Sequence, residues 1–251
     1  MKKALLEDSA GWRRVAVRVL AGLMAAFLLP GCAVITSSVP ELVPNYQPVN
    51  VYRQSEEMPG SVRRVAVLPL TTTTSSALLQ AGAEDLETIL YAELEKSGRF
   101  EVIPVSAGQL REWTGQSSWR ADELLPLNFF EKLRDGTGCD AVLFCQLIRY
   151  QPYEPLAVGW KFSLVEKGGK SKGSTAATKD AKLQIVWSAD EVFDAGDIAV
   201  ANAARSYYSQ HLRNEAPAPD SSTILGSPSR FGQYTLSALF GTLPVRQNQT
   251  H

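Results

Sequence analysis

Side chains that commonly bind metals or carry out catalysis are scarce in this sequence. Its 251 residues include only two histidines, His211 and His251, and three cysteines. Zinc sites draw their ligands mainly from His and Cys, and a nucleophilic triad needs a His as its base. The sequence therefore predicts neither a His-based metal site nor a triad. It favours a protein that has no cofactor and is not an enzyme.

Disulfide bonds are also not expected. Cys139 and Cys145 lie at the start and in the middle of a predicted strand. Six residues of strand span roughly 20 Å, whereas the Cα atoms of a disulfide lie within about 7 Å of each other. The two cysteines are therefore predicted to be buried free thiols.

An excess of positive charge is missing as well. Lys and Arg total 25 residues against 26 for Asp and Glu, so the formal net charge is −1. Proteins that bind nucleic acid usually carry a basic patch or stripe. The composition therefore predicts no nucleic-acid partner.

No apolar run in the sequence is long enough to cross a bilayer as a helix, which takes roughly 20 residues. The run Val19–Leu29 is shorter and follows a basic segment that includes Arg13, Arg14 and Arg18. A positive head, an apolar middle and small residues at the end are typical of a secretory signal peptide. Residues 1–31 are predicted to be one.

The end of this signal has a distinctive form. Leu29-Pro30-Gly31-Cys32 resembles the lipobox of bacterial lipoproteins. The resemblance implies cleavage between Gly31 and Cys32 and acylation of Cys32, which would anchor the chain in a membrane. Ala33 follows the cysteine in place of the Asp that favours retention at the inner membrane, so the outer membrane, facing the periplasm, is expected. The alternative is a plain secretory signal that contains a cysteine.

The mature chain divides by composition into a head domain and connecting segments. The predicted segments are the lipidated, Pro-rich tether 32–61, the head domain 62–212, the linker 213–229, a C-terminal amphipathic helix 230–243 and the tail 244–251. A Pro-rich tether would let the head stand away from the membrane. The alternative is that the end of the tether, Val49–Tyr52, packs on the domain as an edge strand.

Within the head domain, apolar periodicity alternates between strand and helix. Strands are predicted at 63–70, 100–105, 141–148, 158–165 and 182–187, and helices at 81–97, 107–113, 128–135 and 197–212. The order predicts an α/β fold, a single three-layer or two-layer sandwich with a mixed sheet of about four to five strands and flanking helices.

Several of these segments resemble one domain of bacterial envelope proteins. They are Val65–Pro69, Gly98–Pro104, Gly138–Leu143 and Leu183–Ser188. The domain is shared by the curli-secretion lipoprotein, the lipoprotein activators of penicillin-binding proteins and the amino-terminal part of the Tol translocation β-propeller protein. The resemblance implies a non-catalytic module that binds or assembles envelope proteins of transport or cell-wall machinery. It leaves a homo-oligomer open.

Four aromatic residues are candidate partner-binding positions, because interfaces are enriched in such side chains. They are Trp119, Phe231, Tyr234 and Phe240. Trp119 lies in a polar stretch, and the other three belong to the C-terminal helix that follows the linker. The alternative is that this helix covers the domain's own core.

An acidic cluster is the candidate metal site. Asp190, Glu191, Asp194 and Asp197 follow a predicted strand, and hard cations bind carboxylate oxygens. The alternative is a solvated turn with Asp197 as a helix N-cap. A second function class also stays open, a lipid-anchored periplasmic hydrolase of peptidoglycan or glycan that uses two distant carboxylates.

Overall fold

The computed structural model describes residues 46–167, 183–212 and 224–246, which belong to a folded unit that spans Val43–His251. The predicted signal peptide, Gly31 and Cys32 lie outside the described residues, as does most of the linker 213–229. No helix in the described ranges is both long and apolar enough to cross a membrane.

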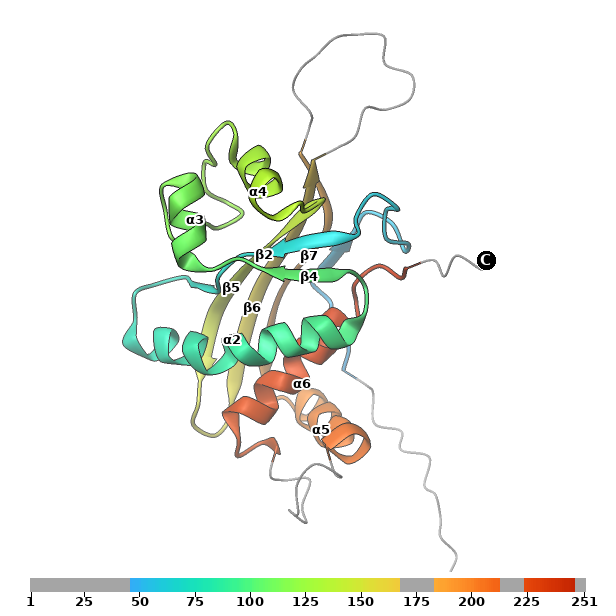
Figure 1. Ribbon diagram of the computed structural model, residues 1–251. Coiled ribbons are helices and arrows are strands. Elements are labelled where there is room, and N and C mark those ends of the chain that lie inside the picture. The colour runs from blue at the N-terminus through green and yellow to red at the C-terminus, as the bar shows by residue number, and fades with distance from the viewer. Residues whose placement is uncertain (1–45, 168–182, 213–223, 247–251) are drawn as a thin grey trace, which may run out of the picture. The chain divides into compact units, whose positions relative to one another are not determined.

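The described residues form one mixed sheet of seven strands in the order β1-β7-β6-β5-β2-β4, with β3 paired to β5 (Figure 1). The strands are β1 (Val51–Arg53), β2 (Arg64–Val67), β3 (Thr71–Thr72), β4 (Glu101–Pro104), β5 (Ala141–Gln151), β6 (Ala157–Lys167) and β7 (Leu183–Asp194). β2 pairs in parallel with β4 and β5, whereas β5, β6 and β7 form an antiparallel meander.

Helices cover both faces of the parallel part of the sheet (Figure 1). They are α2 (Ala77–Ser97), α3 (Ala107–Thr114), α4 (Phe129–Thr137), α5 (Ile198–Tyr207) with a π-helical end at Tyr208–Leu212, and α6 (Pro228–Phe240). Alternate residues along β2 and just after it face opposite cores. Val65 and Val67 face α2 and α6, while Ala66 and Leu68, the residue that follows β2, face α3 and α4. The predicted α/β sandwich is therefore confirmed, with three layers.

Local sequence signals explain several element ends. Gly98 ends α2 with φ of 63°, a conformation that costs glycine little. Ser106 and Gln109 form a capping box at the start of α3. The Asp140 carboxylate accepts hydrogen bonds from the backbone N–H groups of Arg63 and Arg64, at 3.1 and 3.0 Å, and so aligns the start of β5 with β2.

The sheet has two strands more than predicted, and both are short. β3 continues the line of β2 after Pro69, which interrupts the ladder because it has no N–H to donate. β1 lies in the predicted tether and pairs antiparallel with β7. The tether boundary at 61 is therefore wrong for its last part, and the alternative of an edge strand at this place is confirmed.

β7 also extends further than predicted. The sequence stretch from Asp190 onward was expected as a turn, but the strand continues to Asp194. Trp187, Ala189, Glu191 and Phe193 occupy alternating buried positions along it. Because Glu191 is a charged residue at a buried position, the alternation of apolar and polar residues is interrupted there. The predicted strand is too short for this reason.

Candidate functional site

A cavity of about 360 Å³ lies beyond the carboxyl end of β2. β2 leads into α2 on one face of the sheet, whereas its neighbour β4 leads into α3 on the other face. Open α/β sheets bind ligands at such switch points, where the connections of adjacent strands diverge. We call this space the edge cavity.

Three segments line the edge cavity. They contribute Leu70, Thr71 and Thr72 after β2, Gln80, Ala83 and Glu84 from α2, and Ser118, Trp119, Arg120 and Glu123 from the loop between α3 and α4. The lining is mostly polar and has both charge signs. Its chemistry suits a polar or charged group of a partner rather than a large apolar ligand.

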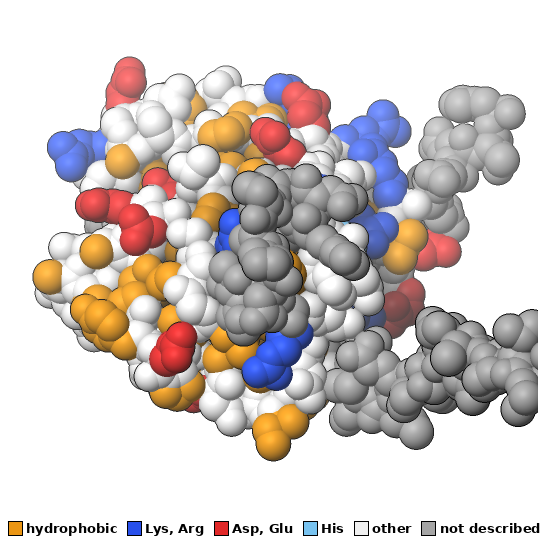
Figure 2. All heavy atoms as spheres, turned by 90° about the horizontal axis from the view of Figure 1, so that it is seen from below, with side chains coloured by type: hydrophobic (Ala, Val, Ile, Leu, Met, Phe, Trp, Pro, Cys, Tyr) orange, Lys and Arg blue, Asp and Glu red, His pale blue; other side chains and the backbone are white. Residues whose placement is uncertain are grey.

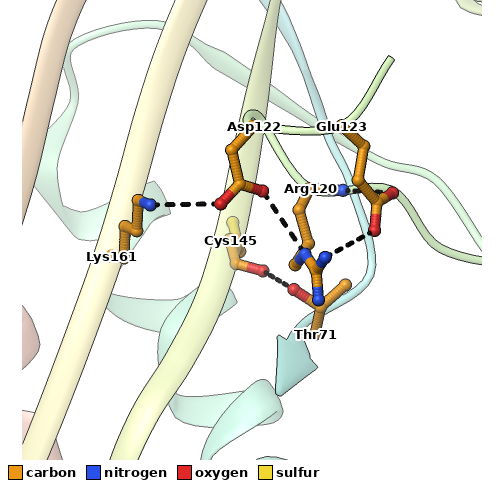
Figure 3. A network of polar contacts seen from close by, with 6 residues as sticks. All are labelled: Thr71, Arg120, Asp122, Glu123, Cys145 and Lys161. Atoms are coloured by element: carbon orange, nitrogen blue, oxygen red, sulfur yellow. Dashed lines mark hydrogen bonds and ion pairs between the residues drawn. The ribbon is translucent and has the colours of Figure 1, made fainter. Parts of the chain in front are cut away.

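The loop between α3 and α4 is held in place by a polar network (Figure 3). The Arg120 guanidinium contacts Asp122 Oδ1 at 3.3 Å and Glu123 Oε1 at 3.1 Å. On its other side, Asp122 Oδ2 lies 3.4 Å from Nζ of Lys161 on β6. The network therefore joins the loop to the centre of the sheet.

The same network sets the electrostatics of the loop. Burial pushes the pKa of Asp122 upward, but Lys161 and Arg120 outweigh this effect and hold the pKa below its ordinary value. The positive charges of Arg120 and Lys161 balance the negative charges of Asp122 and Glu123. Glu84 also lines the cavity and forms no ion pair with another described residue, so it leaves the edge cavity mildly acidic.

Two leucines stand out on this loop. Leu124 and Leu127 are 98% and 105% exposed, although leucine is usually among the most buried residues. Leu124 directly follows Glu123, which lines the edge cavity, and Leu127 lies three positions further on. Phe129, only two residues further, is fully buried between α4 and the sheet. The loop therefore exposes two leucines close in sequence to a residue that lines the acidic cavity.

Acid–base or nucleophilic chemistry has little support in this cavity. A general acid needs a raised pKa, and the pKa of Asp122 is lowered. Both carboxylate oxygens of Glu123 accept from Arg120, at 3.1 and 3.2 Å. The Cys145 thiol below Thr71 is buried, and burial raises its pKa, which disfavours the reactive thiolate. The arrangement is suited to binding.

The four aromatic candidates are core residues in the structure. Phe231, Tyr234 and Phe240 are buried between α6 and the sheet, where the ring of Phe240 packs on Phe162 at 5.3 Å. The expectation of an exposed docking helix is therefore wrong, because α6 completes the domain's own core. Trp119 is only 6% exposed and donates a hydrogen bond from Nε1 to Thr114 Oγ1 at 2.7 Å. It is therefore a fixed part of the lining of the edge cavity.

The acidic candidates do not converge on one point. Asp194 accepts from the Gly196 N–H and pairs with Arg149, while Asp197 caps α5 by accepting from the Ala199 N–H. Asp190 points from the exposed side of β7. Within the described ranges no three His, Cys, Asp or Glu side chains are close enough together to hold a metal ion. The helix-cap alternative is confirmed for Asp197.

Sequence reasoning missed most of the edge cavity. Of its residues, only Trp119 was a candidate, and Arg120, Leu124 and Leu127 were not. The stretch Leu124-Leu125-Pro126-Leu127 does carry a signal, because three leucines precede a helix without the spacing of either a strand or a helix.

Other apolar side chains are exposed at the β5–β6 turn and at the starts of α2 and α5, and Figure 2 shows apolar side chains on the surface seen from below. Those at the turn and at the helix starts include Leu78, Tyr153 and Ile198, which are 44%, 73% and 76% exposed.

Comparisons with known proteins leave the family open. No family model and no curated protein matches the sequence. Among solved structures, the dodecameric PelC from Paraburkholderia phytofirmans is 15% identical, with a TM-score of 0.38, over 78% of this chain and 98% of that chain. The lipoprotein GNA1162 from Neisseria meningitidis is 19% identical, with a TM-score of 0.34, over 60% and 96%.

A third solved structure is the hypothetical protein CT253 from Chlamydia trachomatis. It is 13% identical, with a TM-score of 0.40, over 71% of this chain and 91% of that chain. At these identities and scores the likenesses assign neither a family nor a function to this chain.

Proposed function

We propose that this protein is an outer-membrane lipoprotein, anchored through Cys32, whose periplasmic α/β domain binds another envelope protein without catalysis. The observation that carries the binding role is the exposure of Leu124 and Leu127 beside the edge cavity. Exposed apolar patches rimmed by polar residues mark interaction sites on soluble domains, and two exposed leucines three positions apart on one loop are the candidate for such a patch. The lipobox at Leu29–Cys32 supports the anchor.

The chemistry of the site narrows the partner. Leu124 and Leu127 would bury apolar surface against it, while Glu84 in the edge cavity favours a basic group. The partner is therefore expected to present an apolar segment that carries a Lys or Arg side chain. Ion pairs within the loop keep Arg120 and Glu123 in place, so the surface is formed before the partner arrives.

The binding role is tested by site-specific photo-crosslinking in cells that make the lipidated protein. A crosslinker at position 124 or 127 is expected to capture one and the same envelope protein, and Glu84→Gln should weaken the capture. Crosslinkers at Tyr153 and Ile198 are matched controls, because these apolar side chains are also strongly exposed. Capture from positions 153 and 198 but not from 124 or 127 would assign binding to the other surface and refute the proposal.

The anchor and the absence of catalysis need separate measurements. Mass spectrometry of the mature protein is expected to find a chain that begins at Cys32 and carries acyl groups. An unacylated amino terminus, or one at another residue, refutes the anchor. Hydrolysis of peptidoglycan fragments by the purified protein, abolished by Glu84→Gln, would instead establish the hydrolase alternative.

A further inference from the structure

A second cavity lies between the carboxyl-terminal ends of α2 and α6. Its volume is about 190 Å³, and charged and hydroxyl groups line it, among them Glu93, Lys96, Arg99 and Ser237. It is smaller than pockets that hold drug-sized ligands, which measure roughly 300–1,000 Å³. The size suits a single functional group. We call it the helix-end cavity.

Two buried donors, one that lines this cavity and one beside it, have no hydrogen-bond partner among the described residues. Arg99 Nε is buried and forms no hydrogen bond, and the Arg99 guanidinium makes no ion pair with any described residue. The hydroxyl of Tyr207, a residue 9% exposed, is likewise buried without a hydrogen bond in the described part of the chain. Native structures rarely leave such groups unsatisfied unless water, an ion or a ligand binds them.

The Tyr207 hydroxyl faces the same groups that line the cavity. Burial and the nearby Glu93 carboxylate raise the pKa of Tyr207, while Ser237 and Lys96 act in the opposite direction. Ser237 and Lys96 thus approach the hydroxyl, but neither meets it with hydrogen-bond geometry. The Tyr207 hydroxyl therefore lies close to three of the residues that line the cavity.

The charge of the helix-end cavity favours an anion. Lys96 and Arg99 are cationic, and Glu93 is the one carboxylate among the residues that line it. Oε1 of Glu93 already accepts from Gln233 Nε2 at 2.9 Å and lies 3.5 Å from Lys96 Nζ. Two helix ends with partial negative charge oppose an anion here, so binding must depend on both cations.

We propose that the helix-end cavity binds a phosphate group, held by Lys96, Arg99 and the hydroxyls of Tyr207 and Ser237. Guanidinium, ammonium and hydroxyl donors are the groups that recognise phosphate oxygens. The phosphate is either free inorganic phosphate or the headgroup of an anionic phospholipid. The inference does not depend on the edge cavity or on the proposed partner protein.

The test uses the full mature chain with Cys32→Ser, so that acylation does not itself attach the protein to lipid. In the first arm, the melting temperature is followed against inorganic phosphate, with sodium chloride at equal ionic strength as reference. A saturable rise in the melting temperature is expected. Arg99→Gln and Tyr207→Phe should each weaken the apparent affinity, Arg99→Gln by about tenfold.

The second arm measures cosedimentation with vesicles of phosphatidylglycerol, with phosphatidylcholine vesicles as reference. Binding to phosphatidylglycerol that Arg99→Gln removes identifies a lipid headgroup as the source. Binding of inorganic phosphate without vesicle binding identifies free phosphate. Arg111→Gln, an exposed arginine on α3, carries the same charge change at a distant site and should behave as wild type in both arms.

The melting temperature without ligand distinguishes a ligand-binding role of Arg99 and Tyr207 from a structural one. Within the described residues, neither Arg99 Nε nor the Tyr207 hydroxyl forms a hydrogen bond that its substitution would remove. Arg99→Gln and Tyr207→Phe should therefore leave the melting temperature in chloride unchanged or raise it. The proposal is overturned if phosphate and phosphatidylglycerol both fail to bind, if Arg99→Gln binds like Arg111→Gln, or if Arg99→Gln lowers the melting temperature in chloride.

Discussion

The hydroxyl of Tyr46 donates a hydrogen bond to Oε1 of Glu191 across 145 positions of sequence, at 2.8 Å. The other carboxylate oxygen of Glu191 accepts from the backbone N–H groups of Val49 and Asn50, at 2.9 and 3.0 Å. The Tyr46 ring also packs edge-on against Phe193, with centroids 5.4 Å apart. One buried carboxylate thus fastens the start of the domain to β7, and a membrane tether would end near residue 45.

Glu191→Ala should therefore destabilise the domain strongly. Its loss leaves three part-buried donors without their acceptor, and the net contribution of a hydrogen bond to a charged group is about 1.5–3 kcal/mol. We expect the free energy of unfolding in urea to fall by about 2–4 kcal/mol.

Glu101→Ala is the matched control for this loss. Glu101 is an exposed carboxylate on an edge strand, paired to Arg64 at 3.4 Å. Exposed ion pairs contribute little, so a change below about 1 kcal/mol is expected. Equal losses in Glu191→Ala and Glu101→Ala would show that the contacts to Tyr46, Val49 and Asn50 add no stability.

Glu191 also shows which features of this fold a local sequence pattern can predict and which it cannot. Trp160 and Trp187 lie on clearly alternating stretches, and both are fully buried as predicted. The capping box of Ser106 is likewise encoded within four residues. Glu191, in contrast, finds its donors more than 140 positions away, so no local pattern distinguishes it from the solvated acids around it.

The edge cavity was missed for a related reason. It forms where the loop before α4 lies over the carboxyl end of β2 and the middle of β6, and the contact between Asp122 and Lys161 that holds the loop there joins residues 39 positions apart. The hydropathy pattern predicted the helices on either side of this loop. It gives no information on where an irregular segment lies in the fold. The exposure of Leu124 follows from that placement.

Phe231→Ala tests the conclusion that α6 belongs to the core. Phe231 is fully buried, and α6 packs so closely on α2 that a Cβ at Gly232 would lie 2.4 Å from Leu86 Cδ2. Truncating a buried Phe usually costs about 3–5 kcal/mol. We expect a loss of this size in urea unfolding.

Leu124→Ala serves as the control for Phe231→Ala, because it also truncates a large apolar side chain but one that is 98% exposed. Its effect on the free energy of unfolding should stay within about 0.5 kcal/mol. If Phe231→Ala lowered the free energy of unfolding as little as Leu124→Ala, α6 would not be part of the core. The interpretation of α6 as a docking helix would then be supported.

Buried tyrosines predict loss of stability at high pH. Burial raises the pKa of Tyr91 and Tyr234 above the ordinary value of about 10. The folded state therefore keeps a proton that the unfolded state releases above pH 10, so stability is fully present below that pH and falls as the pH rises. Each such tyrosine contributes a slope of about 1.4 kcal/mol per pH unit.

Tyr234→Phe isolates one of these groups. The Tyr234 hydroxyl is buried and forms no hydrogen bond with the part of the chain that the structure describes, so its removal should change the free energy of unfolding little at pH 7. Between pH 9 and 11 the variant should lose about 1.4 kcal/mol less than wild type, because one titrating group is gone. Tyr153→Phe, at a side chain 73% exposed, is the control and should follow the wild-type curve. Identical curves for Tyr234→Phe and wild type would mean that the ring ionises as easily in the folded chain as in water, which contradicts its burial against Phe193 and Phe231.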